Sequence, residues 1–195
     1  MTYGKLKQKI LSLLDLKAES GVVNGSVYDA VISSMAGAVD SAARKIAASL
    51  KNTVKYTAGE FVGTDSVSMS APTGFIALKS VTIDGKVCSP SKFFLSDGDI
   101  VGRGVPAGQA QIYYYSYPTS VDGATDSTET DFDGVTFDLV AIGAALELCS
   151  EAYPGDAERY STLAGEYDGC IAAAFISGGD RIHVENTLYG KRRLV

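Results

Sequence analysis

The spacing of apolar residues changes twice along the chain and separates helical from β-strand regions. Over the first fifty residues apolar side chains recur every three or four positions, which is the period of an α-helix. We expect one helix over residues 3–16 with Thr2 as its N-cap, and a second over residues 27–50, where Ser26 and Asp29 resemble a capping box. The apolar stripes are Leu6, Ile10, Leu13 and Leu14 in the first helix, and Val31, Met35, Val39, Ala42, Ile46 and Leu50 in the second.

Between residues 52 and 118 the period falls to two, which is typical of β-strands. Asp84–Gly85 and Asp97–Gly98 each separate two runs with strand-like patterns. Asp-Gly readily adopts the positive φ values of a type I′ hairpin turn. The region therefore predicts five to seven short strands forming a small antiparallel sandwich or barrel.

The last strand of this region reads QIYYYSYP and ends at Pro118, which cannot donate to a central ladder. Successive side chains of a strand point to opposite faces, so Tyr113, Tyr115 and Tyr117 share one face. The other face carries Ile112, Tyr114 and Ser116. The row of Tyr113, Tyr115 and Tyr117 is a candidate subunit interface, because tyrosine is enriched at interfaces. Packing within the module is the alternative.

After an acidic loop the helical period returns. We expect Thr136 to cap a third helix, which Pro154–Gly155 ends, and Asp156 to cap a fourth. The short connection predicts an antiparallel αα-hairpin. The stripes are Leu139, Ile142, Leu146, Cys149 and Tyr153 in the third helix, and Tyr160, Leu163, Tyr167, Cys170 or Ile171, and Ala174 in the fourth.

The order of elements predicts an α+β fold: a bundle of about four α-helices with an inserted small antiparallel β module and an extended C-terminal tail. The expected boundaries are 1–51 and 135–176 for the bundle, 52–118 for the module, 119–134 for the acidic loop and 177–195 for the tail.

Composition is that of a folded protein with an uneven charge. Apolar residues make up 46% of the chain and charged residues 21%, close to the globular average. The net charge is −6, and residues 52–176 carry seventeen Asp/Glu against six Lys/Arg, whereas both ends are basic. An acidic middle disfavours a grip on nucleic acid, which needs clustered Lys and Arg.

No apolar run reaches the roughly 18 to 20 residues that span a bilayer, and the N-terminal segment is charged and amphipathic. We therefore expect a soluble intracellular product with no membrane partner. Cys88, Cys149 and Cys170 form no CxxC pair, which favours buried free thiols.

The sequence predicts no catalytic residues, metal site or cofactor. His183 is the single histidine, and with Glu185 it supplies too few ligands for zinc. The segment Gly102–Gly108 has one residue too many for a dinucleotide-binding fingerprint and precedes a strand rather than a helix. It is interpreted as a loop.

Two acidic pairs, Asp97 with Asp99 and Asp131 with Asp133, have the residue types of a general acid and base. Both lie beside glycines, where Asp commonly bonds nearby backbone amides. We interpret them as turn residues. The loop that contains Asp131 also lacks the spacing of an EF-hand.

The C-terminal segment combines apolar and basic residues that a solvated terminus does not need. It is therefore a candidate for ordering on a partner, with a frayed terminus as the alternative. The residues concerned are Ile182, Val184, Leu188, Tyr189, Lys191, Arg192 and Arg193.

This order of parts resembles the head-to-tail adaptor (connector, or neck) proteins of tailed bacteriophages. An N-terminal helical pair is followed by the extended stretch APTGFIALKSVTIDGK, and QIYYYSYP leads through the acidic loop to the next helices. Those helices read GVTFDLVAIGAALELCSEAYPGD and DAERYSTLAGEYDGCIAAAF, and an extended tail follows.

The resemblance implies a non-enzymatic structural virion protein of the neck, made in the host cytoplasm. Its partners would be the portal protein, neighbouring adaptor subunits in a ring of twelve copies, and a tail, stopper or nozzle protein. Duplex DNA would pass through the channel without sequence-specific binding. The resemblance implies that Ile182 to Val195 reach into the portal, with Leu188 and Tyr189 as apolar anchors and Arg192 and Arg193 as polar or ionic contacts.

Two other functions fit the same sequence. A ligand- or carbohydrate-binding module would use the tyrosine face, and it predicts a monomer with a dispensable tail. An acid–base enzyme using Asp97 or Asp99 would need a cleft and a carboxylate with a perturbed pKa.

Overall fold

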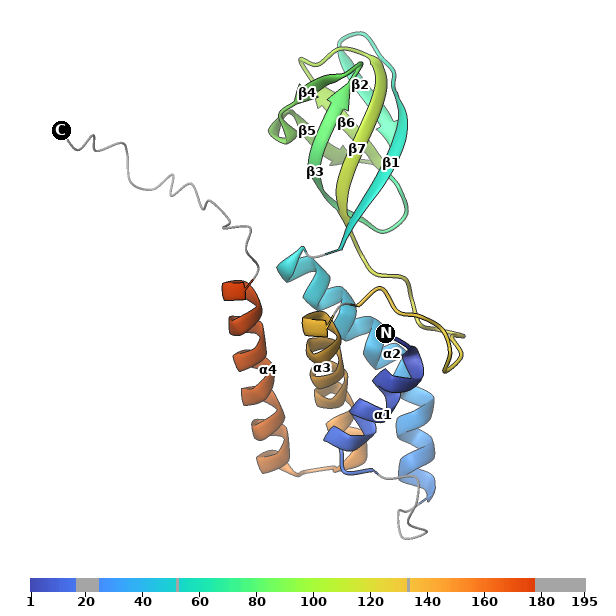
Figure 1. The fold of residues 1–195 in the computed structure, drawn as a ribbon, viewed down its shortest axis with the longest axis vertical. Coiled ribbons are helices and arrows are strands. Elements are labelled where there is room, and N and C mark those ends of the chain that lie inside the picture. Colours follow the sequence, from blue (N-terminus) through green and yellow to red (C-terminus); the bar gives the residue numbers. More distant parts are fainter. Residues whose placement is uncertain (17–24, 52, 133, 178–195) are drawn as a thin grey trace, which may run out of the picture.

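The computed structural model describes residues 1–16, 25–51, 53–132 and 134–177. This part of the chain contains four α-helices and seven β-strands, all paired antiparallel, which confirms the predicted α+β fold (Figure 1). The helices are α1 (Tyr3–Leu13), α2 (Gly25–Leu50), α3 (Gly134–Ala152) and α4 (Ala157–Ser177). None of them, over the residues described, is both long and apolar enough to cross a bilayer.

Helix α3 is the centre of the bundle. Twelve of its nineteen residues are buried, on all sides of the helix, because its sequence is apolar all round rather than along one stripe. Helices α1, α2 and α4 all pack against it. Gly143 makes the close packing possible: a Cβ there would lie 3.1 Å from both the Cβ of Ala42 on α2 and the ring of Tyr167 on α4.

Two expected helix starts differ from the structure, and a third is reached without the expected capping bond. Helix α2 begins at Gly25, so Ser26 lies inside its first turn rather than at the cap. Helix α3 begins at Gly134, and Thr136 is not its cap, because the apolar run draws the first turn into the core and buries Thr136 and Phe137. Thr2 holds the N-cap position of α1, but its side chain makes no capping hydrogen bond.

The cap predicted for α4 is confirmed. The Asp156 carboxylate accepts a hydrogen bond from the Arg159 backbone N–H at 3.0 Å, which satisfies one of the free amides of the first turn.

The β module consists of two facing sheets with a core that includes Phe61, Ile100 and Ile112. The four-stranded sheet has the order β1–β7–β3–β4 and the three-stranded sheet the order β2–β6–β5. The strands are β1 (Val54–Phe61), β2 (Ser66–Ser70), β3 (Phe75–Ile83), β4 (Lys86–Cys88), β5 (Phe93–Ser96), β6 (Asp99–Arg103) and β7 (Gly108–Ser116), with a 3-10 turn over Pro90–Lys92.

Both predicted Asp-Gly hairpins are confirmed. Asp84 and Gly85 have φ values of 46° and 76° between β3 and β4, and Asp97 and Gly98 have 51° and 86° between β5 and β6. Positive φ at both central positions is what a type I′ turn requires.

The β module stands at one end of the bundle and is joined to it through α2 and through the acidic loop that leads from β7 to α3 (Figure 1). Within the loop, the side chains of Val121 and Phe132 are buried in the helical core. Its backbone also pairs with the N-terminal segment, since the Tyr3 N–H donates to the Thr128 carbonyl at 2.8 Å and the Thr130 N–H to the Met1 carbonyl at 2.7 Å. The acidic loop is therefore packed as part of the bundle.

Because α3 lies at the centre of the bundle, a substitution that leaves a cavity in it should strongly destabilise the protein. We expect Leu139→Ala to lower the free energy of unfolding by about 3 kcal/mol, because Leu139 is fully buried and its partners cannot collapse into the space. Val135→Ala, at a position 53% exposed on the same helix, is the matched control and should cost less than about 1 kcal/mol. Chemical denaturation followed by far-UV circular dichroism measures both, and equal losses would contradict a central α3.

Candidate functional site

The acidic pairs do not converge on one site. Asp97 forms the β5–β6 turn and its carboxylate accepts a hydrogen bond from the Ser96 hydroxyl at 3.3 Å, whereas Asp99 opens β6. Asp133 and His183 lie outside the described residues. In the part of the chain that the structure describes, no three His, Cys, Asp or Glu residues are grouped as a metal site would need.

The cysteines are all free thiols, but only Cys149 is buried. Burial raises the pKa of the Cys149 thiol. Cys88 and Cys170 are half-buried, so the expectation of buried thiols is wrong for these two, which lie on partly open parts of β4 and α4.

The predicted alternation of the tyrosine strand is confirmed. Ile112 and Tyr114 point into the module core, whereas Tyr113 is 47% exposed on the outer face of the four-stranded sheet. Tyr56 on β1 lies directly opposite, with ring centroids 5.2 Å apart and planes at 52°. This cross-strand pair stabilises the sheet.

The other two tyrosines of the row are less accessible. Tyr115 is half-buried, with the Lys79 ammonium 6.0 Å from its ring centroid. Tyr117 follows the strand, is half-buried, and its N–H donates to the Gly74 carbonyl at 2.8 Å. On this face of the sheet the exposed aromatic surface therefore comes mainly from Tyr113 and Tyr56, and the role of the row as an interface stays a prediction.

Asp131 closes the acidic loop. Its Oδ2 accepts hydrogen bonds from the Thr119 N–H at 2.9 Å and the Thr119 hydroxyl at 2.8 Å, and the Lys55 ammonium of β1 lies 3.9 Å away. The backbone hydrogen bond is the main reason that the pKa of Asp131 is lowered, and partial burial opposes it. Asp131 thereby links the two ends of the loop to the β module.

Asp40 on α2 fixes the same loop to the bundle. Its carboxylate accepts hydrogen bonds from the Val121 N–H at 2.9 Å and from the Ser120 hydroxyl. Lys7 on α1 adds an ion pair with Asp126. The sequence interpretation missed Asp40. The sequence did contain a signal for it, because Asp40 directly follows Val39, which belongs to the apolar stripe of this helix.

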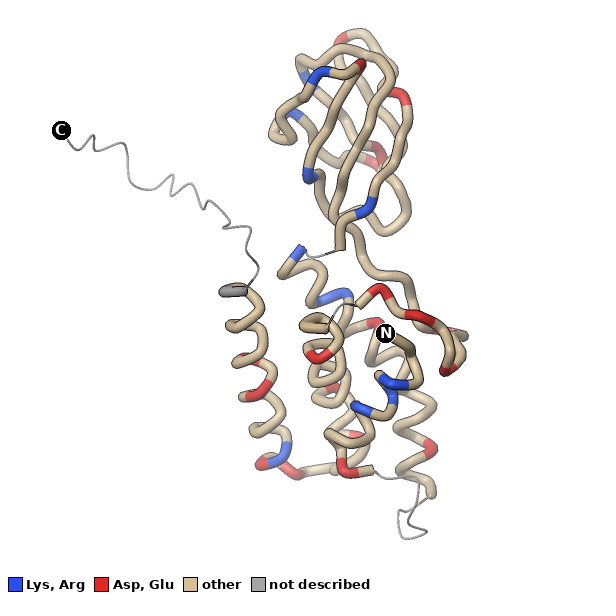
Figure 2. Tube along the Cα trace, in the orientation of Figure 1, with Lys and Arg blue, Asp and Glu red and all other residues tan. Residues whose placement is uncertain are grey.

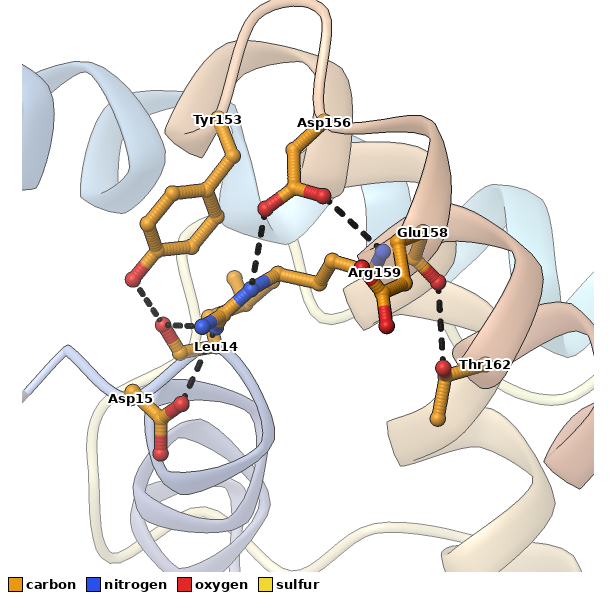
Figure 3. A network of polar contacts seen from close by, with 7 residues as sticks. All are labelled: Leu14, Asp15, Tyr153, Asp156, Glu158, Arg159 and Thr162. Atoms are coloured by element: carbon orange, nitrogen blue, oxygen red, sulfur yellow. Dashed lines mark hydrogen bonds and ion pairs between the residues drawn. The ribbon is translucent and has the colours of Figure 1, made fainter.

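A second polar cluster holds the end of α1 against the α3–α4 corner (Figure 3). The Leu14 carbonyl accepts hydrogen bonds from the Tyr153 hydroxyl and from Nη1 of Arg159, the latter at 3.3 Å. Arg159 also pairs with Asp15 at 3.1 Å and stacks on the Tyr153 ring, with its Cζ 4.0 Å from the centroid. Asp15 ends the helix with a φ of 52°.

The exposed sides of α2 and α4 include large side chains such as Ile32, Tyr160 and Phe175, but each helix also has a stretch of small residues beside a charge. On α2 that charge is Arg44, and Asp40, one turn earlier, is half-buried and bound to the acidic loop. We define the acidic α4 face as the exposed residues Glu158, Ser161, Gly165, Asp168, Gly169 and Ala172, and the basic α2 face as the exposed residues Ser33, Gly37, Arg44 and Ala48. Figure 2 shows basic residues on α2 toward the β module and acidic residues along α4, while Asp29 on α2 and Arg159 on α4 carry the opposite charges.

The predicted portal-binding tail, from Ile182 to Arg193, lies outside the described residues. Its assignment stays a prediction.

The distinctive parts of the described α+β chain are the acidic loop, held in place by Asp40 and Asp131, and the exposed faces of α2 and α4. No protein-family model matches the chain, and a search of curated proteins found no significant relative.

The lowered pKa of Asp131 predicts a pH-dependent stability. Its ionised form accepts both Thr119 hydrogen bonds, so its contribution is complete above the ordinary Asp pKa of about 3.9 and is lost as the pH falls through the lower pKa of the folded protein. Asp131→Asn should therefore lower the thermal midpoint at neutral pH, and the difference from the parent should shrink on acidification. Asp122→Asn in the same loop is the control. A difference that is constant with pH would contradict this role.

Tyr153 and Arg159 both donate to the Leu14 carbonyl, so each should partly compensate for the loss of the other. The double variant Tyr153→Phe/Arg159→Met removes both side-chain donors to the Leu14 carbonyl and should cost about 1 to 3 kcal/mol. Each single variant should cost less, because one donor remains. Hydrogen exchange at the end of α1 measures the local opening, and Lys5→Met on the exposed side of α1 is the control. Equal exchange in the double variant and the control would contradict the contact.

Proposed function

We propose that the protein is a head-to-tail adaptor of a tailed bacteriophage. It assembles as a ring beneath the portal, extends the DNA channel, and offers a platform to the tail. The proposal joins the resemblance of the sequence to the arrangement of the folded parts.

The observation that carries the proposal is the junction between the helical bundle and the β module, where several contacts hold the acidic loop in place. Both ends of the acidic loop meet at Asp131. Its early part is fixed to α2 by Asp40 and its later part to the N-terminal segment by backbone pairing, and Val121 and Phe132 anchor it in the core. A chain built only to bind a small ligand has no need to fix a second module so firmly. A protein that must hold a portal on one side and a tail on the other has that need.

The unlike faces of α2 and α4 add a second argument. An interface between two different patches of the same subunit is heterologous, and heterologous contacts close into rings when the rotation allows. The acidic middle of the chain also suits a DNA channel, because acidic surfaces repel phosphates and let the duplex move without sticking.

The ring is tested by measuring mass. We expect a purified portal assembly mixed with the protein to gain about one copy per portal subunit in mass photometry or native mass spectrometry, even if the free protein is a monomer. The protein alone is the control. A portal that gains no mass, together with a stable monomer, would contradict the proposal and favour the ligand-binding alternative.

The tail assignment is tested separately. A chain lacking residues 180–195 should keep its circular dichroism spectrum and lose docking. Leu188→Ser/Tyr189→Ser should weaken docking by roughly tenfold or more, because buried apolar anchors dominate such contacts. Asn186→Ser/Thr187→Ser in the same segment is the matched control. Docking that survives the deletion would contradict the tail assignment and leave the ring intact.

A further inference from the structure

We infer that, in an assembly of this protein, the acidic α4 face of one copy packs against the basic α2 face of the next, with Asp168 paired to Arg44. The inference deepens the proposed function, on which it rests, by naming the two surfaces that close the ring.

The two faces point away from each other on one subunit. Helices α2 and α4 both pack against α3. Met35 and Ala42 of α2 and Leu163 and Ala174 of α4 are buried toward the interior, and the faces lie on the opposite sides of their helices. One copy therefore cannot join its own two faces, whereas neighbouring copies can join theirs in succession.

Both faces carry glycines that the subunit itself does not use. Gly37, Gly165 and Gly169 lie inside helices, and a Cβ added at any of them would meet nothing within 4 Å. Glycine weakens a helix relative to alanine, and packing inside one copy does not require it here. A second helix that approaches closely would require it, because small residues let helix axes come near one another.

The charges of the two faces fall at the same level along the bundle. Gly143 of α3 meets both Ala42 of α2 and Tyr167 of α4, so these two residues stand at about equal height. Helices α2 and α4 both run toward the β module (Figure 1). One or two residues further on, Arg44 and Asp168 are therefore level as well. A ring whose axis follows the helices brings Arg44 of one copy beside Asp168 of the next.

Neither charge has an ion-pair partner among the described residues, in contrast to the nearby Lys45, whose ammonium lies 2.6 Å from Glu147. Both side chains are exposed. The complementary charges, the equal height and the small residues around them favour a second copy of this chain as the occupant of each face. An unrelated partner would have no reason to match both faces at once.

Charge reversal with rescue tests the contact. On the portal assembly, Arg44→Glu and Asp168→Arg should each raise the concentration for half-saturation by roughly tenfold or more, because like charges then meet across the interface. The double variant Arg44→Glu/Asp168→Arg should restore most of the loss. Lys5→Glu on α1 and Glu151→Arg near the end of α3 make the same charge changes at exposed sites outside the two faces and should have little effect.

The outcomes separate this inference from the proposed function. Parent protein that binds the portal as a ring, with single reversals that also bind normally or a double variant that is not rescued, would overturn the contact alone. If the parent protein does not bind any portal, the same variants are compared by sedimentation of concentrated free protein. Self-association that falls in the single variants and returns in the double variant would support the contact, and its absence would overturn it.

Discussion

The middle of helix α3 must be covered on every side, and the rest of the bundle follows from that constraint. Residues 139–145 are apolar and buried all round the helix, and such a segment is stable in water only inside other elements, so α1, α2 and α4 have to pack around it. Gly143 sets how near α2 and α4 come to its axis. This packing leaves the outer faces of α2 and α4 turned to solvent, which is where their small and charged residues lie.

The acidic loop connects the helical bundle to the β module and is bound to both. Asp40 binds its early part and Asp131 joins its two ends, while Lys55 connects it to β1. The clustered acids are thus partly used as acceptors for backbone amides and hydroxyls, and this is consistent with the common use of Asp in turns. These contacts give the protein a defined separation between the helical bundle and the β module, and an adaptor would depend on that separation.

The sequence predicted the parts that local rules control. Asp-Gly turns, the alternation in β7 and the Asp156 cap depend on neighbouring residues only, and all three are present. It missed Asp40 and Arg159, because their partners lie at least eighty residues away in the chain. It also placed Thr136 at a cap, since helical spacing shows an apolar face but does not reveal that α3 is buried on all sides. The faces of α2 and α4 required knowledge of which side of each helix packs inward.

The proposed assembly is a ring of copies of this protein on a portal. A cryo-electron microscopy reconstruction of the protein bound to its portal assembly tests this most directly. The account predicts symmetric density beneath the portal, with bundles side by side and α4 of each copy against α2 of the next. Density for isolated copies, or neighbours that meet through other faces, would contradict it.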